Sequence, residues 1–159
     1  MVRFYLPRYE DLWFRQKLLG DAATMSYNHA WGGTIDFPES RWAAWYDKWI
    51  QSAGSSRFYR YLQNEDGVFV GEAAYHLDVE TCMADIIVFS EYRGKGYGTQ
   101  GLHLLCEEAK HRGIETLYDD IAADNPSIRL FLKAGFTEEY RTADSIMLKK
   151  RLTWSHIPA

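Results

Sequence analysis

The sequence has few cysteines and no long apolar run. Its two cysteines, Cys82 and Cys106, show none of the spacings that bind metals or form redox motifs. No apolar stretch approaches the roughly 20 residues that a membrane helix needs. The first five residues, 1–5, lack the apolar segment of a signal peptide. We therefore expect a reduced, cytoplasmic protein with no metal site and no membrane contact.

Positive charge is also in short supply. The 22 acidic residues outnumber the 18 Lys and Arg residues, the formal net charge is −4, and the pI is about 5.7. Proteins that bind nucleic acid usually carry a basic surface, so we expect no nucleic-acid partner. The acidic balance mildly favours a positively charged small molecule.

Apolar and aromatic residues are abundant. Hydrophobic residues make up 47% of the 159 residues, which argues against disorder and suffices for one domain with a core. We place that domain at residues 1–152 and a C-terminal tail at 153–159. The aromatic content of 16%, together with an exposed sheet edge, is compatible with a homodimer.

One glycine-rich stretch carries the strongest local signal. A β-like run, Met83 to Phe89, leads into it, and a helical run over 99–112 leads out. Glycines allow a tight turn, and free N–H groups at a helix start attract an anion. The spacing fits neither the dinucleotide motif G-x-G-x-x-G nor the P-loop. We expect a phosphorylated cofactor at the residues of this stretch: Arg93, Gly94, Lys95, Gly96, Tyr97, Gly98 and Thr99.

The spacing R-x-x-G-x-G resembles the acetyl-CoA signature of the GNAT superfamily of N-acetyltransferases. A second block, Asp124 to Phe136, resembles the later motif of that family, in which an Asn and a short helix precede Lys-x-Gly-Phe. The two motifs cover about residues 83–136. The resemblance implies an α/β fold: one domain with a central mixed, mostly antiparallel sheet of six to seven strands. About four helices would flank this sheet, which would be splayed between the fourth and fifth strands.

The resemblance also implies acetyl-CoA as the cosubstrate. Its pantetheine arm would pair with the strand edge at Ile87, Val88 and Phe89. Asn125 matches the Asn of the later motif, although Asp124 is an alternative for that position. In many GNAT enzymes a Tyr of the later motif lies near the sulfur, and here the matching residue is Phe131. A tyrosine general acid is therefore not expected.

Local patterns predict several elements. Apolar residues from Trp42 to Ile50 recur at helical spacing, with Asp36 as the expected N-cap. The segment 21–37 is expected to be a loop. Residues 68–77 and 82–89 are expected to form a hairpin around Val79 and Glu80.

The register of this hairpin predicts a carboxylate cluster. Pairing Ala74 with Asp85 places Glu72 and His76 diagonally beside Asp85, with Val70 further along the same face. Two nearby carboxylates raise one pKa toward neutrality, which suits a general base. Glu72 and Asp85 are therefore candidate catalytic residues. The alternative is that both simply face solvent on an open sheet.

The acceptor side is predicted from the segment between the first two helices. Aromatic side chains beside a carboxylate suit an organic cation, so Tyr27, Trp31 and Asp36, together with His76, are candidate substrate residues. The predicted function is acetyl transfer to a primary amine of a small cation, such as a polyamine or an aminoglycoside-like compound. Two alternatives remain: acetylation of a protein N-terminus or lysine, and a non-catalytic acyl-CoA-binding domain.

Overall fold

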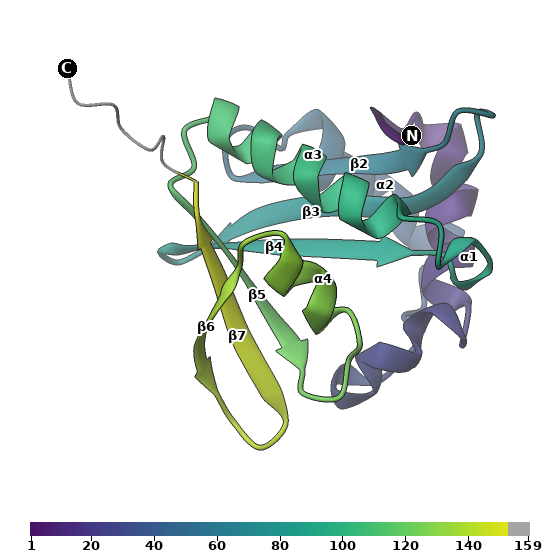
Figure 1. Ribbon diagram of the computed structural model, residues 1–159. Helices are drawn as coiled ribbons and strands as arrows, with labels where there is room; N and C mark the ends of the chain where they lie inside the picture. The colour runs from purple at the N-terminus through teal and green to yellow at the C-terminus, as the bar shows by residue number, and fades with distance from the viewer. Residues whose placement is uncertain (153–159) are drawn as a thin grey trace.

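The sheet has seven strands in the order β1-β2-β3-β4-β5-β7-β6 (Figure 1). The computed structural model describes residues 1–152, without the side chain of Ala30; the predicted tail, 153–159, lies outside the described residues. All neighbouring strands are antiparallel except β4 and β5, so the predicted mixed, mostly antiparallel sheet is confirmed. The strands are β1 Arg3–Tyr5, β2 Arg57–Gln63, β3 Phe69–Asp78, β4 Thr81–Val88, β5 Thr116–Ala122, β6 Thr137–Arg141 and β7 Ser145–Arg151.

Four α-helices and several short helical segments accompany the sheet. The α-helices are α1 Leu12–Gly20, α2 Trp42–Tyr46, α3 Tyr97–His111 and α4 Ile128–Lys133. The shorter segments are η1 Tyr9–Asp11, η2 Thr24–Trp31, η3 Glu39–Arg41, η4 Asp47–Gln51 and η5 Ser90–Tyr92. None of the helices within residues 1–152 is long and apolar enough to cross a membrane.

Two local predictions between α1 and α2 were wrong. The segment 21–37 is not a plain loop, because it contains the 3-10 helix η2, which ends at Gly32 in the left-handed region at φ 102°. Asp36 does not cap the following helix: the cap position of η3 is Pro38, and no side chain bonds there. The proline provides the extended backbone that opens this helix, so Asp36 is left exposed.

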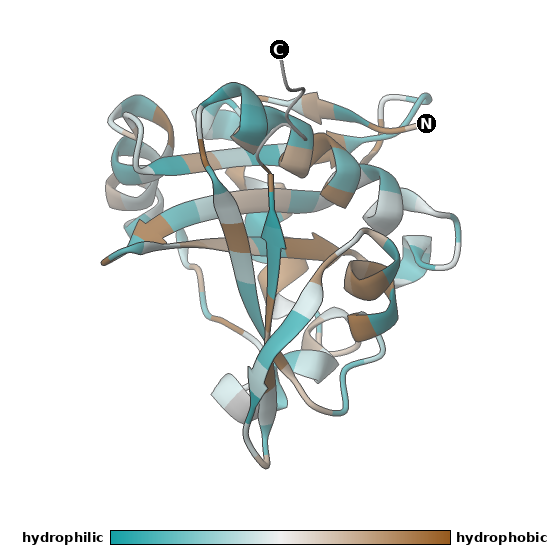
Figure 2. Cartoon of the chain, turned by 60° about the vertical axis from the view of Figure 1, so that its left-hand side comes forward, coloured by the Kyte–Doolittle hydropathy of each residue, from teal (hydrophilic) through white to brown (hydrophobic). Residues whose placement is uncertain are grey.

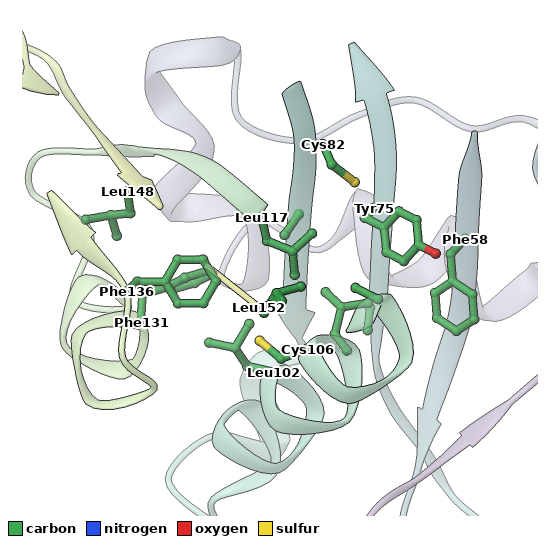
Figure 3. Close-up of a cluster of buried hydrophobic side chains, with 14 of the residues drawn as sticks. Phe58, Tyr75, Cys82, Leu102, Cys106, Leu117, Phe131, Phe136, Leu148 and Leu152 are labelled. Atoms are coloured by element: carbon green, nitrogen blue, oxygen red, sulfur yellow. The ribbon is translucent and has the colours of Figure 1, made fainter. Parts of the chain in front are cut away.

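Helices α3 and α4 cover one face of the sheet over the main apolar core (Figure 3). In α3, apolar residues at helical spacing face the sheet, and the helix carries polar residues on its other side (Figure 2). Helices α1 and α2 pack over the opposite face, where a second, aromatic cluster lies. The two faces therefore keep separate cores.

The β3–β4 hairpin has the predicted register. Asp78 pairs with Thr81, Ala74 with Asp85, and Glu72 with Ile87. Val70, however, does not share the face of Glu72, because it packs in the core under α3. A bulge opposite Leu62 and Gln63 shifts the pairing near the start of β3 and turns Val70 to the other face.

Strands β4 and β5 separate after a short contact, as predicted. They pair in parallel only at Cys82 with Leu117 and at Met83 with Tyr118. Beyond these pairs the two strands diverge into a V (Figure 1). The edge of β4 after Met83 that faces β5 therefore has no strand partner within the described residues.

Candidate functional site

A cleft of about 540 Å³ lies in the V between β4 and β5. The glycine turn and the start of α3 line one end of it, and side chains of β3, β4 and β5 line the interior. Segment η2 and the start of α4 contribute further walls. The predicted residues that line the cleft are Tyr27, Trp31, Glu72, Asp85, Ile87, Val88, Arg93, Gly94, Gly96, Tyr97, Gly98, Thr99, Asn125 and Phe131.

The glycine turn presents the first amides of α3 to the cleft. Gly94 and Gly96 adopt φ angles of 80° and 85°, which L side chains rarely adopt. Gly96 occupies the cap position of α3, and no side chain caps the helix there. A Cβ at Gly98 would lie 2.8 Å from Leu130, so glycine permits the close approach of α3 and α4. The helix start therefore offers N–H groups to an anion.

The two basic residues of this turn, Arg93 and Lys95, do not point free cationic groups into the cleft. The Arg93 guanidinium donates to the carbonyls of Thr24 at 2.7 Å and of Val88 at 3.2 Å. It also lies 4.9 Å from the ring centre of Tyr27. Arg93 thus ties η2 to the end of β4, and Lys95 is not among the residues that line the cleft. The groups of this turn that remain available to an anion are therefore mainly backbone amides.

The predicted cofactor edge is partly accessible. Ile87 and Val88 line the cleft, whereas Phe89 packs in the aromatic core and its N–H donates to the Val70 carbonyl at 2.8 Å. Asn125 reaches the cleft, and its Oδ1 accepts from the Ser127 N–H at 2.8 Å. That bond shapes the turn into α4.

Glu72 and Asp85 meet on one face of the hairpin, and both line the cleft. Glu72 is 3% exposed, and the Tyr59 hydroxyl donates to its Oε1 at 2.5 Å. The side chain of Asp85 is exposed, but it is exposed into the cleft, whose walls surround it. Desolvation in this narrow space, followed by the charge of Glu72, raises the pKa of Asp85 to about 7. A ligand that fills the cleft would desolvate Asp85 further.

Arg15 is a cleft residue that the sequence did not reveal. Its guanidinium lies over the rings of Trp45 at 4.4 Å and Phe37 at 4.7 Å, and its Nε is 3.9 Å from Glu72 Oε1. That Nε is buried and makes no hydrogen bond. These residues come from separate elements, and the poor apolar periodicity of the first helix provides no signal for Arg15.

The predicted acceptor residues separate in space. Tyr27 and Trp31 line the cleft, whereas Asp36 is exposed and outside it. His76 is also outside: its ring lies 5.9 Å from the Trp49 ring, and burial lowers the pKa of His76. His29 of η2 contacts Asp124, which precedes α4: its Nε2 lies 3.0 Å from both carboxylate oxygens of Asp124. This contact joins η2 to the segment before α4.

Two further carboxylates of β5, Asp119 and Asp120, line the cleft where the strands separate. Burial raises the pKa of Asp119 well above its usual range, and the charges of Asp85 and then Asp120 add to this effect. The cleft therefore joins a helix start that no side chain caps to a group of carboxylates, one of which, Asp85, has a pKa raised to about 7. Such a site can hold a phosphate-bearing ligand and take a proton from an amine.

Comparison with known proteins assigns the chain to a family. A family model described as the acetyltransferase (GNAT) family matches residues 21–136. An uncharacterized N-acetyltransferase, YobR of Bacillus subtilis, is 38% identical over 56 residues. That match spans 35% of this chain and 23% of the relative, so it covers about a quarter of the relative's length.

Solved structures show the same fold. Spermidine N-acetyltransferase from Vibrio cholerae, in complex with CoA and spermine, has a TM-score of 0.81 and 17% identity over 95% of each chain. A structure of yncA from Salmonella typhimurium with its cofactor acetyl-CoA has a TM-score of 0.75 and 23% identity. That alignment covers 100% of this chain and 97% of the other.

Proposed function

Since the chain belongs to the acetyltransferase (GNAT) family, we propose that it transfers the acetyl group of acetyl-CoA to a primary amine of a small cation, such as a polyamine or an aminoglycoside-like compound. One observation carries the proposal. A single cleft runs from an uncapped helix start to the carboxylates Glu72 and Asp85, along an unpaired strand edge.

The cosubstrate would lie along the V. The amides at the start of α3, from Gly96 to Thr99, would bind its pyrophosphate with the help of the helix dipole. The free edge of β4 at Ile87 and Val88 would pair with the amides of the pantetheine arm. Arg93 would support this site indirectly, because its bonds to Thr24 and Val88 position the turn.

The reaction would begin with proton removal from the amine. Ionised Asp85 would take this proton, while Glu72, hydrogen bonded to Tyr59, supplies a neighbouring charge. The neutral amine would then attack the thioester carbonyl, and a backbone N–H at Ile87 or Val88 would stabilise the oxyanion. Collapse of the tetrahedral intermediate releases the thiolate and leaves the amide product.

The acceptor class follows from the charge of the cleft. Asp85, Asp119 and Asp120 line its interior, and Tyr27 and Trp31 offer aromatic faces. A small polyamine fits this combination through charge pairing and cation–π contact. The similarity in fold to an enzyme solved with spermine supports the same class.

Calorimetry with acetyl-CoA tests the cofactor site, with NADH and ATP as controls. We expect selective binding with a Kd in the micromolar range, about −8 kcal/mol. A thiol-release assay with spermidine, an aminoglycoside and a lysine peptide then tests the acceptor. Turnover of the peptide alone would favour a protein acetyltransferase. Binding without thiol release from any amine would favour a non-catalytic acyl-CoA-binding domain, and no binding by folded protein would refute the proposal.

Replacing Arg15 with Gln is expected to shift the acid limb of the pH profile of kcat/KM to higher pH. The positive charge of Arg15 lowers the pKa of Asp85, so its loss raises that pKa and delays formation of the active carboxylate. Arg57→Gln is the matched control, because Arg57 also stacks on a tryptophan, Trp49, but does not line the cleft. An unshifted limb in Arg15→Gln would contradict this role.

A further inference from the structure

In the proposed reaction the departing thiolate takes up a proton. Phe131, the α4 residue that matches the tyrosine of the family motif, cannot donate one. Phe131 lines the cleft, is 2% exposed, and packs against Phe136 with ring centres 5.0 Å apart. Its ring carries no hydroxyl group. Tyr92 and Tyr97 line the cleft as well, but they belong to the glycine-turn end, where the phosphates would lie. The acidic side chains that line the cleft where β4 and β5 separate are therefore the candidates for a proton donor.

The alternation of side chains along β4 and β5 separates the carboxylates by face. In β4, Ile86 packs in the core under α3, and Ile87 packs in the core under α1 and α2. Asp85 has the same parity as Ile87 and therefore lies on the α1 and α2 face. In β5, Leu117 and Ile121 pack in the core under α3 and α4. Asp119 lies midway between them.

Asp119 therefore lies on the face that α4 and Phe131 cover. Its strand partner Leu148 packs in the same core, which agrees with this placement (Figure 3). Asp120 has the opposite parity and lies on the face of Asp85. Both reach the cleft immediately beyond the last β4–β5 pair, Met83 with Tyr118. Where the strands separate, Asp85 and Asp120 thus lie on one face of the sheet and Asp119 lies on the other.

The surroundings of Asp119 favour its protonated form. Burial is the main cause, and the charges of Asp85 on β4 and Asp120 on β5 act in the same direction. The charged groups on the face of Asp85 are Glu72 on β3, Arg15 on α1 and Asp120 on β5, and Asp119 lies on the other face across the V. Because the charge of Asp85 acts on Asp119, ionisation of Asp85 favours the protonated form of Asp119. The pair holds one proton when Asp85 is ionised and Asp119 is not.

We propose that Asp119 is the general acid that protonates the departing CoA thiolate, while Asp85 on the opposite face accepts the proton of the amine. This inference rests on the proposed function. Asp85 first passes the proton of the ammonium to water and is ionised again. The C–N bond forms as the neutral amine attacks, and the tetrahedral nitrogen then loses its second proton to Asp85. The C–S bond then breaks, and the sulfur takes the proton of Asp119. Transfer of the proton from Asp85 to Asp119 restores the pair.

The experiment compares wild-type protein with Asp119→Asn and Asp120→Asn across the pH range, with thiol release from acetyl-CoA as the readout and spermidine as the acceptor. Asn is nearly isosteric with Asp but cannot supply the proton. We expect Asp119→Asn to lower kcat by about 10²- to 10³-fold and to lose the high-pH limb of the profile. Its acetyl-CoA affinity by calorimetry should stay within about threefold of wild type, a difference of less than 1 kcal/mol.

Asp120→Asn is the matched control on the other face of the same strand. It should raise KM for spermidine and keep the high-pH limb. An Asp119→Asn variant that keeps kcat and the high-pH limb would overturn the inference but not the proposed function. A loss of activity that reflects only weaker acetyl-CoA binding would do the same. Absence of thiol release by the wild-type protein with any amine would overturn the proposed function and the inference together.

Discussion

The double variant Glu72→Gln, Asp85→Asn is expected to lose acetyl transfer by about 10²- to 10⁴-fold in kcat/KM. Asp85 is the carboxylate with a pKa of about 7, raised by desolvation within the cleft and by the charge of Glu72. It must be ionised to accept the proton of the amine. In the wild-type protein, kcat/KM should therefore rise with pH through about 7, and Asp85→Asn should lack this rise.

Stability distinguishes this loss of catalysis from a loss of folding. The pKa of an unfolded Asp is about 3.9, whereas the fold raises the pKa of Asp85 to about 7. Between these values the unfolded state binds fewer protons, so the free energy of unfolding falls as pH rises through this window. Asp85→Asn removes that penalty and should be no less stable than wild type above pH 7.

Single variants assign the two roles. Tyr59→Phe removes the hydroxyl that donates to Glu72 Oε1, with little change in the shape of the side chain. It should lower kcat/KM less than Asp85→Asn, because Glu72 acts through Asp85. Full activity in the double variant, with the fold intact by circular dichroism, would refute the base assignment.

Replacing Gly71 with Ala should destabilise the fold by on the order of 3 kcal/mol, because a side chain there overpacks the sheet. A Cβ at this position would lie 2.2 Å from the Ile87 carbonyl oxygen and 3.1 Å from the Val88 Cα. Both atoms belong to the backbone and cannot rotate away. For a chain of this size the loss corresponds to a fall in Tm of roughly 6–12 °C.

Gly71 also positions the site, since it pairs with Val88 next to the pair formed by Glu72 and Ile87. A shift of β4 would move the free edge proposed to bind pantetheine, so Gly71→Ala should also weaken acetyl-CoA binding. Gly20→Ala is the control, because no atom lies within 4 Å of a Cβ built there. Urea unfolding of both variants measures the difference. Equal stability in the two would contradict the close approach of β3 and β4.

The elements that could be predicted from the sequence are those specified by neighbouring residues. The β3–β4 hairpin follows from a two-residue turn and period-2 alternation, so the Ala74–Asp85 pair and the place of Glu72 were correct. Helix α3 follows from its 3.6-residue periodicity, and the glycine turn before it from its spacing. In each case the deciding contacts join residues close together in the chain.

The bulge at the start of β3 and the N-cap before α2 show the limit of such patterns. Val70 changes face because β2 imposes an irregular pairing there, and alternation along β3 alone contains no sign of it. Asp36 fits the spacing of a capping box, but Pro38 opens the helix instead. Where two local patterns compete, as Asp36 and Pro38 do for the helix start, the packing of the chain decides which one forms.

By itself, then, the sequence determined the order of elements, the glycine turn and the carboxylates of the hairpin. Only the tertiary structure decided the partners of the charged side chains. Arg15 meets Glu72, Trp45 and Phe37 from different elements, and Arg93 bonds to carbonyls of η2 and β4 rather than facing a phosphate. Asp85 and Asp119 lie on opposite faces of the sheet, and the divergence of β4 and β5 lets both line one cleft. Such contacts depend on how α1, η2 and β5 pack around the hairpin, and side-chain packing over long sequence separations leaves no periodic pattern in the chain.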